Sequence, residues 1–245
     1  MSLNERHNSI LSILRDKRSA SVSYLASKLF VSEATVRRDL TEMQKLGLIE
    51  RSHGGAVLSD NAEEVSIFVR MNKNSKEKEQ TASRALKYIP EFRSVFIDSS
   101  STALALAERM DLSFKTVVTN NLQTAIMLSG KRDINLIILG GSVQYNTVSS
   151  TGSFTSRQIE EFSFDLMISS CAAVRGDEVY ESSLEQKEIK STAMKRSKHK
   201  ILLFDSTKYG ASGAYKISEI TDYDTVVSNA EPPRDFFDGD CGIVY

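Results

Sequence analysis

Apolar residues recur at helical spacing in two short segments at the start of the chain. The first segment lies within 6–16, and the second lies within 19–30, where the spacing extends to Phe30. Serines precede the apolar positions of the second segment and can cap its first turn. The pattern therefore predicts two short amphipathic helices.

A third helix is predicted from the next stretch of the chain. Ser32 is the expected N-cap, Val36, Leu40 and Met43 fall on one face, and Gly47 follows as a stop signal. The predicted connection to the second helix is only about two residues long, which a helix-turn-helix requires. Residues 48–58 then alternate apolar and polar side chains around a glycine pair, which predicts a β-hairpin wing.

The remainder alternates strand-like and helical patterns. A helix is predicted in 75–89, and six short runs rich in β-branched residues follow at 94–100, 115–121, 134–141, 164–174, 199–205 and 224–229. Helical stretches such as 101–110, 122–130 and 184–197 separate most of these runs. This order predicts a parallel α/β sheet. The expected domains are 1–58 for the winged helix, 59–74 for a polar linker and 75–245 for the α/β domain.

Composition excludes several classes of protein. The chain has 245 residues with 40% hydrophobic, enough for one small and one medium core. No apolar run approaches the roughly 18 to 20 residues of a membrane span, and the N-terminus lacks the order of a secretory signal. Two cysteines and three histidines show no metal-ligand spacing. We therefore expect a cytoplasmic protein without a membrane contact, a metal or a cofactor.

The net charge of −1 hides an asymmetry between the two parts of the chain. Residues 1–58 carry nine Lys and Arg against six Asp and Glu, which gives +3. Arg37 and Arg38 lie in the first half of the third helix, the half that meets base edges when a helix enters the major groove. A solvated face, with Arg38 paired to Glu42, is the alternative interpretation.

Polar residues follow four of the predicted strands. They are Asp98, Ser99, Ser100, Ser101 and Thr102; Thr119, Asn120 and Asn121; Gly140 and Gly141; and Asp205 and Lys208. Ligands of parallel sheets bind at the carboxyl ends of strands, and a helix N-terminus attracts phosphate. Simple N-caps would also explain serine-rich turns. Four polar strand ends together favour a phosphorylated, hydroxyl-rich ligand, with Lys208 available to neutralise phosphate.

The N-terminal part resembles the winged helix-turn-helix of DeoR-type bacterial transcriptional regulators. The matching residues are Ser32, Thr35, Arg37, Arg38, Asp39, Leu40, Gly47, Arg51, His53, Gly54 and Gly55. The DNA-binding residues that this implies are Ser32, Thr35, Arg37, Arg38, Arg51, His53 and Gly54. We expect the wing to hold Arg51 and His53 near the DNA backbone; alternatively, His53 only packs against the hairpin.

The remainder resembles the DeoR sensor domain. Asp98–Thr102, Thr119–Asn121, Leu139–Gly141 and Asp205–Lys208 match its loops, and Lys190 falls where the family has a helical lysine. The resemblance implies a Rossmann-like fold similar to sugar-phosphate isomerases. Two residues depart from the pattern: Ser100 replaces a glycine of the phosphate loop, and Gln186 replaces an acidic residue.

Together these features predict a DNA-binding transcriptional regulator rather than an enzyme. The expected function is repression of a sugar-metabolism operon, with operator binding modulated by a phosphorylated sugar. A homo-oligomer, dimer or tetramer, would present several recognition helices to repeated half-sites. The alternative is a sugar-phosphate isomerase-like enzyme with an appended DNA-binding domain, for which Asp98, Asp205 or Lys208 could act as a base.

Overall fold

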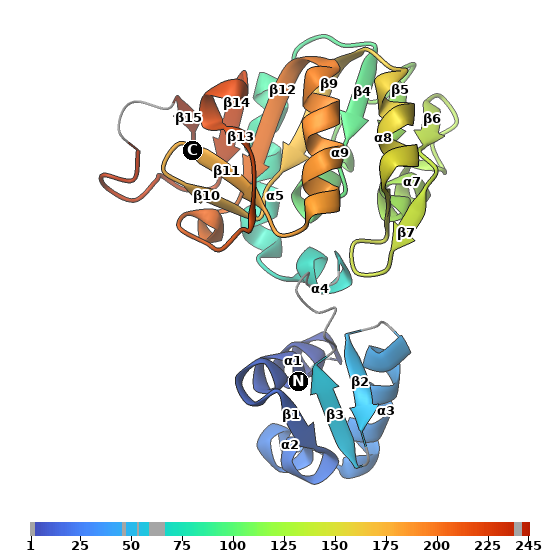
Figure 1. Cartoon of the computed structure of the whole chain (residues 1–245), viewed down its shortest axis with the longest axis vertical. Helices are drawn as coiled ribbons and strands as arrows, with labels where there is room; N and C mark the ends of the chain where they lie inside the picture. Colours follow the sequence, from blue (N-terminus) through green and yellow to red (C-terminus); the bar gives the residue numbers. More distant parts are fainter. Residues whose placement is uncertain (1–2, 46–47, 53, 59–66, 238–241) are drawn as a thin grey trace. The chain divides into compact units, whose positions relative to one another are not determined.

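The computed structural model describes residues 3–45, 48–52, 54–58, 67–237 and 242–245. Contacts within the chain divide it into two compact units, Met1–Lys73 and Asn74–Tyr245. Figure 1 shows the first as a small helical unit with a short sheet and the second as a larger layered α/β unit. Each unit is described separately below.

The first unit is a winged helix-turn-helix, as predicted. Its elements are α1 (Leu3–Lys17), β1 (Ser19–Ser21), α2 (Val22–Leu29), α3 (Glu33–Lys45), β2 (Ile49–Ser52) and β3 (Gly55–Leu58). The strands form an antiparallel sheet in the order β1-β3-β2. Val36, Leu40 and Met43 are fully buried against α1 and α2, which confirms the predicted inner face of the third helix.

The turn between α2 and α3 differs from the prediction. Phe30 does not continue the apolar stripe of the second helix: it caps α2 in the left-handed conformation, with φ 55° and ψ 42°, and its side chain is 95% exposed. The left-handed backbone ends the helix and directs the ring away from the core. The turn therefore comprises Phe30, Val31 and Ser32, and Ser32 caps α3 by accepting from the Thr35 N–H at 3.2 Å.

The expected linker, 59–74, is partly helical. Residues 59–66 lie outside the described part, but Ile67–Asn72 form helix α4, and Ile67 is 1% exposed. The apolar residues of 67–72 lie within a largely polar stretch, so the composition of the segment did not indicate a helix. Asn74 belongs by its contacts to the second unit.

The second unit is built on a parallel sheet of seven described strands in the order β15-β14-β12-β9-β4-β5-β6. The strands are β4 (Ser94–Ile97), β5 (Thr116–Thr119), β6 (Asn135–Ile138), β9 (Phe164–Ser170), β12 (Ser197–Phe204), β14 (Thr225–Ser228) and β15 (Ile243–Val244). Six of these were predicted from the apolar runs. The parallel α/β class is thus confirmed.

Helices cover both faces of this sheet (Figure 1). One face carries α5 (Ser75–Ala85), α6 (Ser101–Ala107) and α7 (Leu122–Leu128), and the other carries α8 (Ser153–Glu160) and α9 (Leu184–Lys195). Short 3-10 helices are η1 (Leu86–Tyr88), η2 (Ser206–Lys208) and η3 (Ile220–Asp222). Successive strand residues face opposite sides, so Val95 and Ile97 pack under α5 and α6 while Phe96 packs under α8 and α9.

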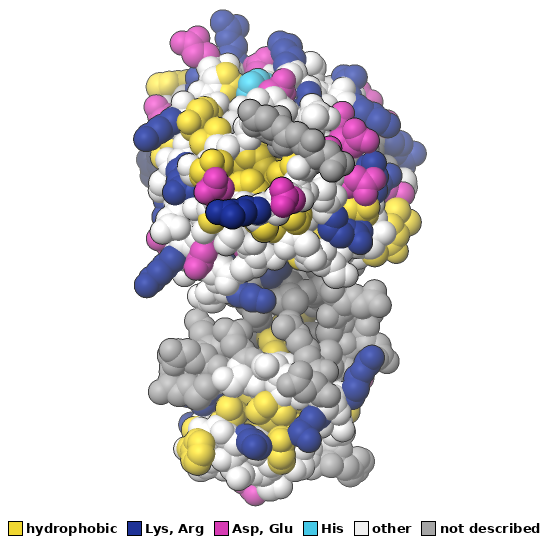
Figure 2. Space-filling view, turned by 90° about the vertical axis from the view of Figure 1, so that its left-hand side faces the viewer, with side chains coloured by type: hydrophobic (Ala, Val, Ile, Leu, Met, Phe, Trp, Pro, Cys, Tyr) yellow, Lys and Arg dark blue, Asp and Glu magenta, His cyan; other side chains and the backbone are white. Residues whose placement is uncertain are grey.

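Two smaller sheets were not predicted. β7 (Ser142–Gln144) pairs with β8 (Ser149–Thr151), and β10 (Ala173–Arg175), β11 (Glu178–Glu181) and β13 (Tyr215–Glu219) form an antiparallel sheet. The latter packs over Leu202 and Phe204 of β12. Figure 2 views the molecule from the side of this small sheet and shows hydrophobic side chains grouped between charged ones on the second unit.

The strand order places a topological switch point at β4. From β4 the chain proceeds through β5 to β6 in one direction, and it then continues through β9 to β12 in the other. A crevice forms where two such halves diverge, outside the carboxyl ends of the strands. The carboxyl ends of β4 and β9 are therefore the expected ligand site. Among the described helices, none is both long and apolar enough to cross a lipid bilayer.

Candidate functional site

The outer face of α3 carries the two predicted arginines, and their contacts differ. Arg37 donates to Glu33 Oε2 at 2.6 Å, one turn earlier on the helix. The guanidinium of Arg38 is exposed, and no acceptor for it is found within the described residues. The helical ion pair considered from the sequence, Arg38 with Glu42, is therefore replaced by Arg37 with Glu33. Arg38 remains available to an external acceptor.

Arg51 of the wing forms hydrogen bonds with α3. Its Nη1 donates to Thr41 Oγ1 at 3.2 Å and to the Arg37 carbonyl at 3.4 Å. Arg51 thus lies along α3 rather than at the tip of the hairpin. Gly54 adopts φ 81° in the two-residue turn between the paired Ser52 and Gly55; its neighbour His53 lies outside the described residues.

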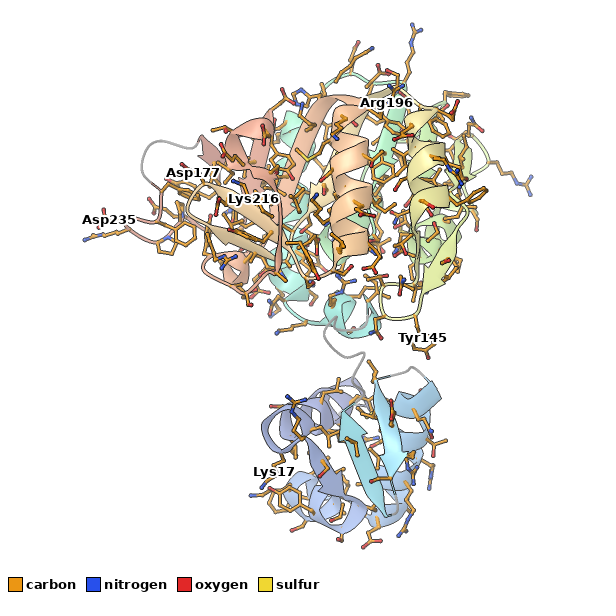
Figure 3. All side chains as sticks on the ribbon, in the orientation of Figure 1. Lys17, Tyr145, Asp177, Arg196, Lys216 and Asp235 are labelled. Atoms are coloured by element: carbon orange, nitrogen blue, oxygen red, sulfur yellow. The ribbon has the colours of Figure 1, made fainter. Side chains whose placement is uncertain are left out.

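Buried and aromatic contacts fix the orientation of these helices. Asp39 of α3, 2% exposed, accepts from Arg6 Nε at 2.8 Å and Nη2 at 3.0 Å. Lys17, labelled in Figure 3, has its Nζ 5.2 Å from the centre of the Tyr24 ring, and Lys28 Nζ lies 6.0 Å from it. The resemblance placed Asp39 among the signature residues, and in the structure Asp39 joins α3 to α1 through Arg6.

In the second unit, Asp98 joins the two halves of the sheet at the switch point. Its Oδ2 accepts from Ser169 Oγ at 2.8 Å and from the Ser170 N–H at 3.0 Å, both on β9. Its Oδ1 accepts from the Ser100 N–H and hydroxyl at 2.9 and 2.5 Å. Burial raises the pKa of Asp98, but the charge of Lys190 and the bonds from Ser100 and Ser170 outweigh burial and hold the pKa below its usual value.

Lys190 of α9 is buried beside this carboxylate. Its Nζ lies 3.0 Å from Asp98 Oδ2, donates to the Ser170 carbonyl at 2.5 Å and contacts Glu181 Oε1. Burial lowers the pKa of Lys190, but the charges of Asp98 and Glu181 outweigh it and raise the pKa above its usual value. All three ammonium hydrogens have acceptors within the chain. The described contacts of Lys190 are therefore structural: they hold α9 to Asp98, Ser170 and Glu181.

The loop after β4 leads directly into α6. The Ser100 hydroxyl accepts from the Ala103 N–H at 3.1 Å and so serves as the N-cap. Ser101 and Thr102 form the first turn, whose backbone N–H groups have no partner within the helix. The serine in place of the expected glycine is thus explained: it caps the helix and holds Asp98.

Gln186 links this loop to residues that the sequence did not identify. Its Oε1 accepts from Ser99 Oγ at 2.7 Å, and its Nε2 donates to Ser149 Oγ at 2.9 Å and Thr147 Oγ1 at 3.3 Å. An amide both accepts and donates, which a carboxylate cannot do, so glutamine suits this position. The serine- and threonine-rich stretch 147–151 was the available signal.

The residues after β5 continue the same polar network. Thr119 Oγ1 donates to the Ile97 carbonyl at 2.7 Å, and Asn121 caps α7 while its Nδ2 donates to the Thr147 carbonyl at 3.1 Å. Asn120 Nδ2 donates to the Ser150 carbonyl at 2.9 Å, whereas its buried Oδ1 has no partner within the described residues.

Gly140 and Gly141 follow β6, the outer strand of the sheet, and lie against α8. The Gly140 carbonyl accepts from Thr155 Oγ1 at 2.8 Å and Gln158 Nε2 at 3.0 Å. Gly141 has φ 149°, and a Cβ there would lie 2.1 Å from Thr155 Oγ1. Gly140 therefore contacts α8 through hydrogen bonds, and Gly141 contacts it through close packing.

After β12, Asp205 has one satisfied and one unsatisfied oxygen. Its Oδ1 accepts from the Thr207 N–H at 3.0 Å, from the Thr207 hydroxyl and from Asn74 Nδ2 at 3.4 Å. Its Oδ2 is buried without a partner within the described residues. Lys208 is partly exposed, and no described residue accepts from its ammonium group. Burial raises the pKa of the nearby Cys171 thiol to about 12, which Lys208 and Lys190 partly oppose.

The structure thus brings most of the predicted residues to one edge of the sheet. Hydrogen bonds connect the ends of β4 and β9 through Asp98, and they connect the ends of β4 and β5 through Gln186 and Thr147. Asp205 and Lys208 follow β12, the neighbour of β9, while Gly140 and Gly141 lie at the far side. Buried hydroxyl, amide and carboxylate groups beside an available cation suit an anionic polyol.

Comparison with known proteins identifies a family for both units. The profile of the DeoR C-terminal sensor domain matches residues 73–230, and that of the DeoR-like helix-turn-helix domain matches residues 6–62. The chain is similar to the HTH-type transcriptional regulator GolR of Listeria innocua serovar 6a, with 32% identity over 92% of this chain and 90% of that protein. It is also similar to the glycerol-3-phosphate regulon repressor of Escherichia coli K12, with 30% identity over 95% and 93%.

Among solved structures, the chain matches ribose 5-phosphate isomerase A from Neisseria gonorrhoeae with a TM-score of 0.39 and 15% identity. The match covers 54% of this chain and 52% of the isomerase. Similarity at this level carries no argument about activity.

Proposed function

Because this chain belongs to the DeoR family of transcriptional regulators, we propose that it represses a sugar-metabolism operon and that a phosphorylated sugar modulates its operator binding. The first unit reads DNA with α3, and the second unit holds the effector at the carboxyl ends of β4, β5, β9 and β12. One relative is named as a glycerol-3-phosphate regulon repressor, which favours a phosphorylated polyol as the class of effector.

The single observation that carries this proposal is the unequal pairing of polar groups at the strand ends. Lys190 and Asp98 satisfy one another, whereas Asp205 Oδ2 and Asn120 Oδ1 are buried acceptors without described partners. A buried acceptor without a donor costs about 1 to 3 kcal/mol. Hydroxyl groups of a sugar supply such donors.

The phosphate would lie at the loop 98–102. The N–H groups of Ser101 and Thr102, in the first turn of α6, would donate to it, and the ammonium group of Lys208 would add positive charge. No cofactor or metal is required by this arrangement. Within the described residues, no cluster of three or more His, Cys, Asp or Glu side chains could hold a metal ion.

We propose that the protein is not an enzyme. An aldose-ketose isomerase needs a base with a free lone pair and a pKa near the working pH. Asp98 accepts five close contacts from neighbouring donors, and its lowered pKa makes it a poor proton acceptor. Lys190, with its raised pKa, remains charged. Asp98 and Lys190 therefore orient their neighbours rather than transfer protons.

Regulation requires the second unit to influence the first. A ligand changes DNA binding only if it prefers one of the DNA-competent and DNA-incompetent states. We propose a cytoplasmic homo-oligomer, a dimer or tetramer, that presents recognition helices to half-sites spaced by about one DNA turn, roughly 34 to 36 Å.

A thermal-shift screen of phosphorylated and unphosphorylated sugars tests the effector proposal directly. The expected result is a rise in unfolding temperature with one phosphorylated sugar and none with its unphosphorylated form. The same compound must change the mobility shift of a duplex that the protein selects from random DNA. Turnover of the compound to an isomer would instead support the enzymatic alternative, and absence of any shift across the panel would contradict the proposal.

A further inference from the structure

Phe30 combines two features that oppose stability. Its backbone is left-handed, with φ 55° and ψ 42°, a conformation in which the Cβ of a bulky residue clashes with the backbone. Asn or Gly would adopt it at lower cost. Its ring is 95% exposed, so the side chain gains almost nothing from burial in return.

The described part of the first unit gives no structural reason for a phenylalanine at this position. The backbone N–H of Phe30 bonds to the Ala26 carbonyl, an interaction that any residue other than proline can make. The ring is absent from the buried core of the unit, to which its neighbours Leu29 and Val31 contribute. Backbone strain that persists without a packing benefit points to a functional contact.

The position in the fold indicates the partner. Phe30 lies two residues before Ser32, the N-cap of α3, and the N-terminal residues of a recognition helix meet base edges in the major groove. Thr35 and Arg38, which has no acceptor among the described residues, follow in the first two turns. The one apolar group that the major groove offers to an aromatic ring beside that end of the helix is the C5-methyl group of thymine.

We propose that Phe30 is a specificity-determining residue whose ring packs against a thymine methyl group of the operator. This inference rests on the proposed DNA binding by the first unit. It does not depend on the proposed effector. The ring contributes a preference for thymine at one position, next to the bases that α3 reads.

The test uses the full chain with Phe30→Asn, since asparagine suits the left-handed backbone but lacks the apolar ring. Phe114 in the second unit provides a matched control, because it also has a positive φ, 61°, and is 89% exposed. Phe114→Asn therefore makes the same chemical change outside the DNA-binding unit. The probe is a duplex that the wild-type protein selects from a random pool, with each thymine replaced in turn by uracil, which lacks only the methyl group.

We expect Phe30→Asn to keep or raise the unfolding temperature and to weaken binding of the selected duplex by roughly fivefold to fiftyfold. One uracil substitution should weaken binding by wild type and Phe114→Asn but not by Phe30→Asn. Wild-type affinity of Phe30→Asn, a lower unfolding temperature, or uniform affinity across all uracil probes would each overturn the inference. Failure of the wild-type protein to select any duplex would instead contradict the proposed function.

Discussion

The ammonium nitrogen of Lys190 lies 3.0 Å from Oδ2 of Asp98, and both side chains are almost fully removed from solvent. Glu181 completes the cluster on the other side of the lysine. The arrangement holds α9 to the carboxyl ends of β4 and β9, so that one interaction serves both folding and the geometry of the candidate ligand site.

Replacing this lysine should be costly. Lys190→Met leaves two buried carboxylates without their counterion, and breaking a buried pair in this way costs roughly 3 to 5 kcal/mol. Urea unfolding of the full chain measures the loss. Lys195→Met, on an exposed residue of the same helix, is the control and should change stability by less than about 0.5 kcal/mol. Equal stability of the two variants would show that the cluster adds little.

Lys208 provides a test of phosphate binding that leaves the fold intact. Its ammonium group has no described acceptor, so Lys208→Gln should not unfold the protein. Once the thermal-shift screen has identified a phosphorylated sugar, the variant should need about tenfold more of it for a half-maximal response. Operator affinity without the sugar should not change. Lys87→Gln, on an exposed residue, is the control; an unchanged response by Lys208→Gln would remove this lysine from the phosphate site.

The two arginines of α3 should contribute unequally to DNA binding. Arg38→Ala should cost about 1 to 3 kcal/mol in operator affinity if the guanidinium contacts a base, and should flatten the salt dependence if it contacts phosphate. Arg37→Ala should cost less, because Glu33 already neutralises Arg37 in the free protein. Mobility shifts at several salt concentrations measure both effects. A larger loss from Arg37→Ala would reverse this assignment.

Asp165 should contribute to the free energy of unfolding by an amount that depends on pH. Its carboxylate accepts from Lys198 and from the Arg93 and Ser94 N–H groups, which lower its pKa to about 2. Because the folded pKa lies below the unfolded value of about 3.8, the contribution is fully present above pH 4 and is lost as the pH falls toward 2.

Asp165→Asn removes this titration. Its unfolding free energy should therefore fall less steeply than that of the wild type between pH 4 and 2, and the two curves should converge at the acid end. Asp133→Asn, the same change at an exposed position, is the matched control. Parallel curves for wild type and Asp165→Asn would contradict the prediction.

The sequence predicted the main sheet because its central strands are buried on both faces. Runs such as 95–97 and 201–204 are continuously apolar, a pattern typical of buried parallel strands. Because the carboxyl ends of parallel strands share one edge of the sheet, the polar residues after these strands were expected to gather there. The approximate site followed from the same periodicity that predicted the fold.

The remaining parts depended on tertiary contacts without a local signal. Ser149–Thr151 form a buried strand of hydroxyl residues, stabilised by partners as distant in sequence as Gln186, so no apolar alternation marks them. The exposure of Phe30 followed from one backbone angle, which an apolar period does not reveal. The partner of Lys190, Glu181, lies on a separate strand of a sheet that was not predicted.

Asn74, the first residue of the second unit, matters for the construction of chimeric regulators. Its left-handed backbone, tolerated by asparagine, lets its Nδ2 donate to both Asp205 Oδ1 and Thr207 Oγ1. A sensor grafted onto a foreign DNA-binding unit should therefore begin at or before Asn74. A cut one residue later, at the first residue of α5, would remove the amide that donates to Asp205 and Thr207, and the resulting defect could be mistaken for loss of communication between the grafted parts.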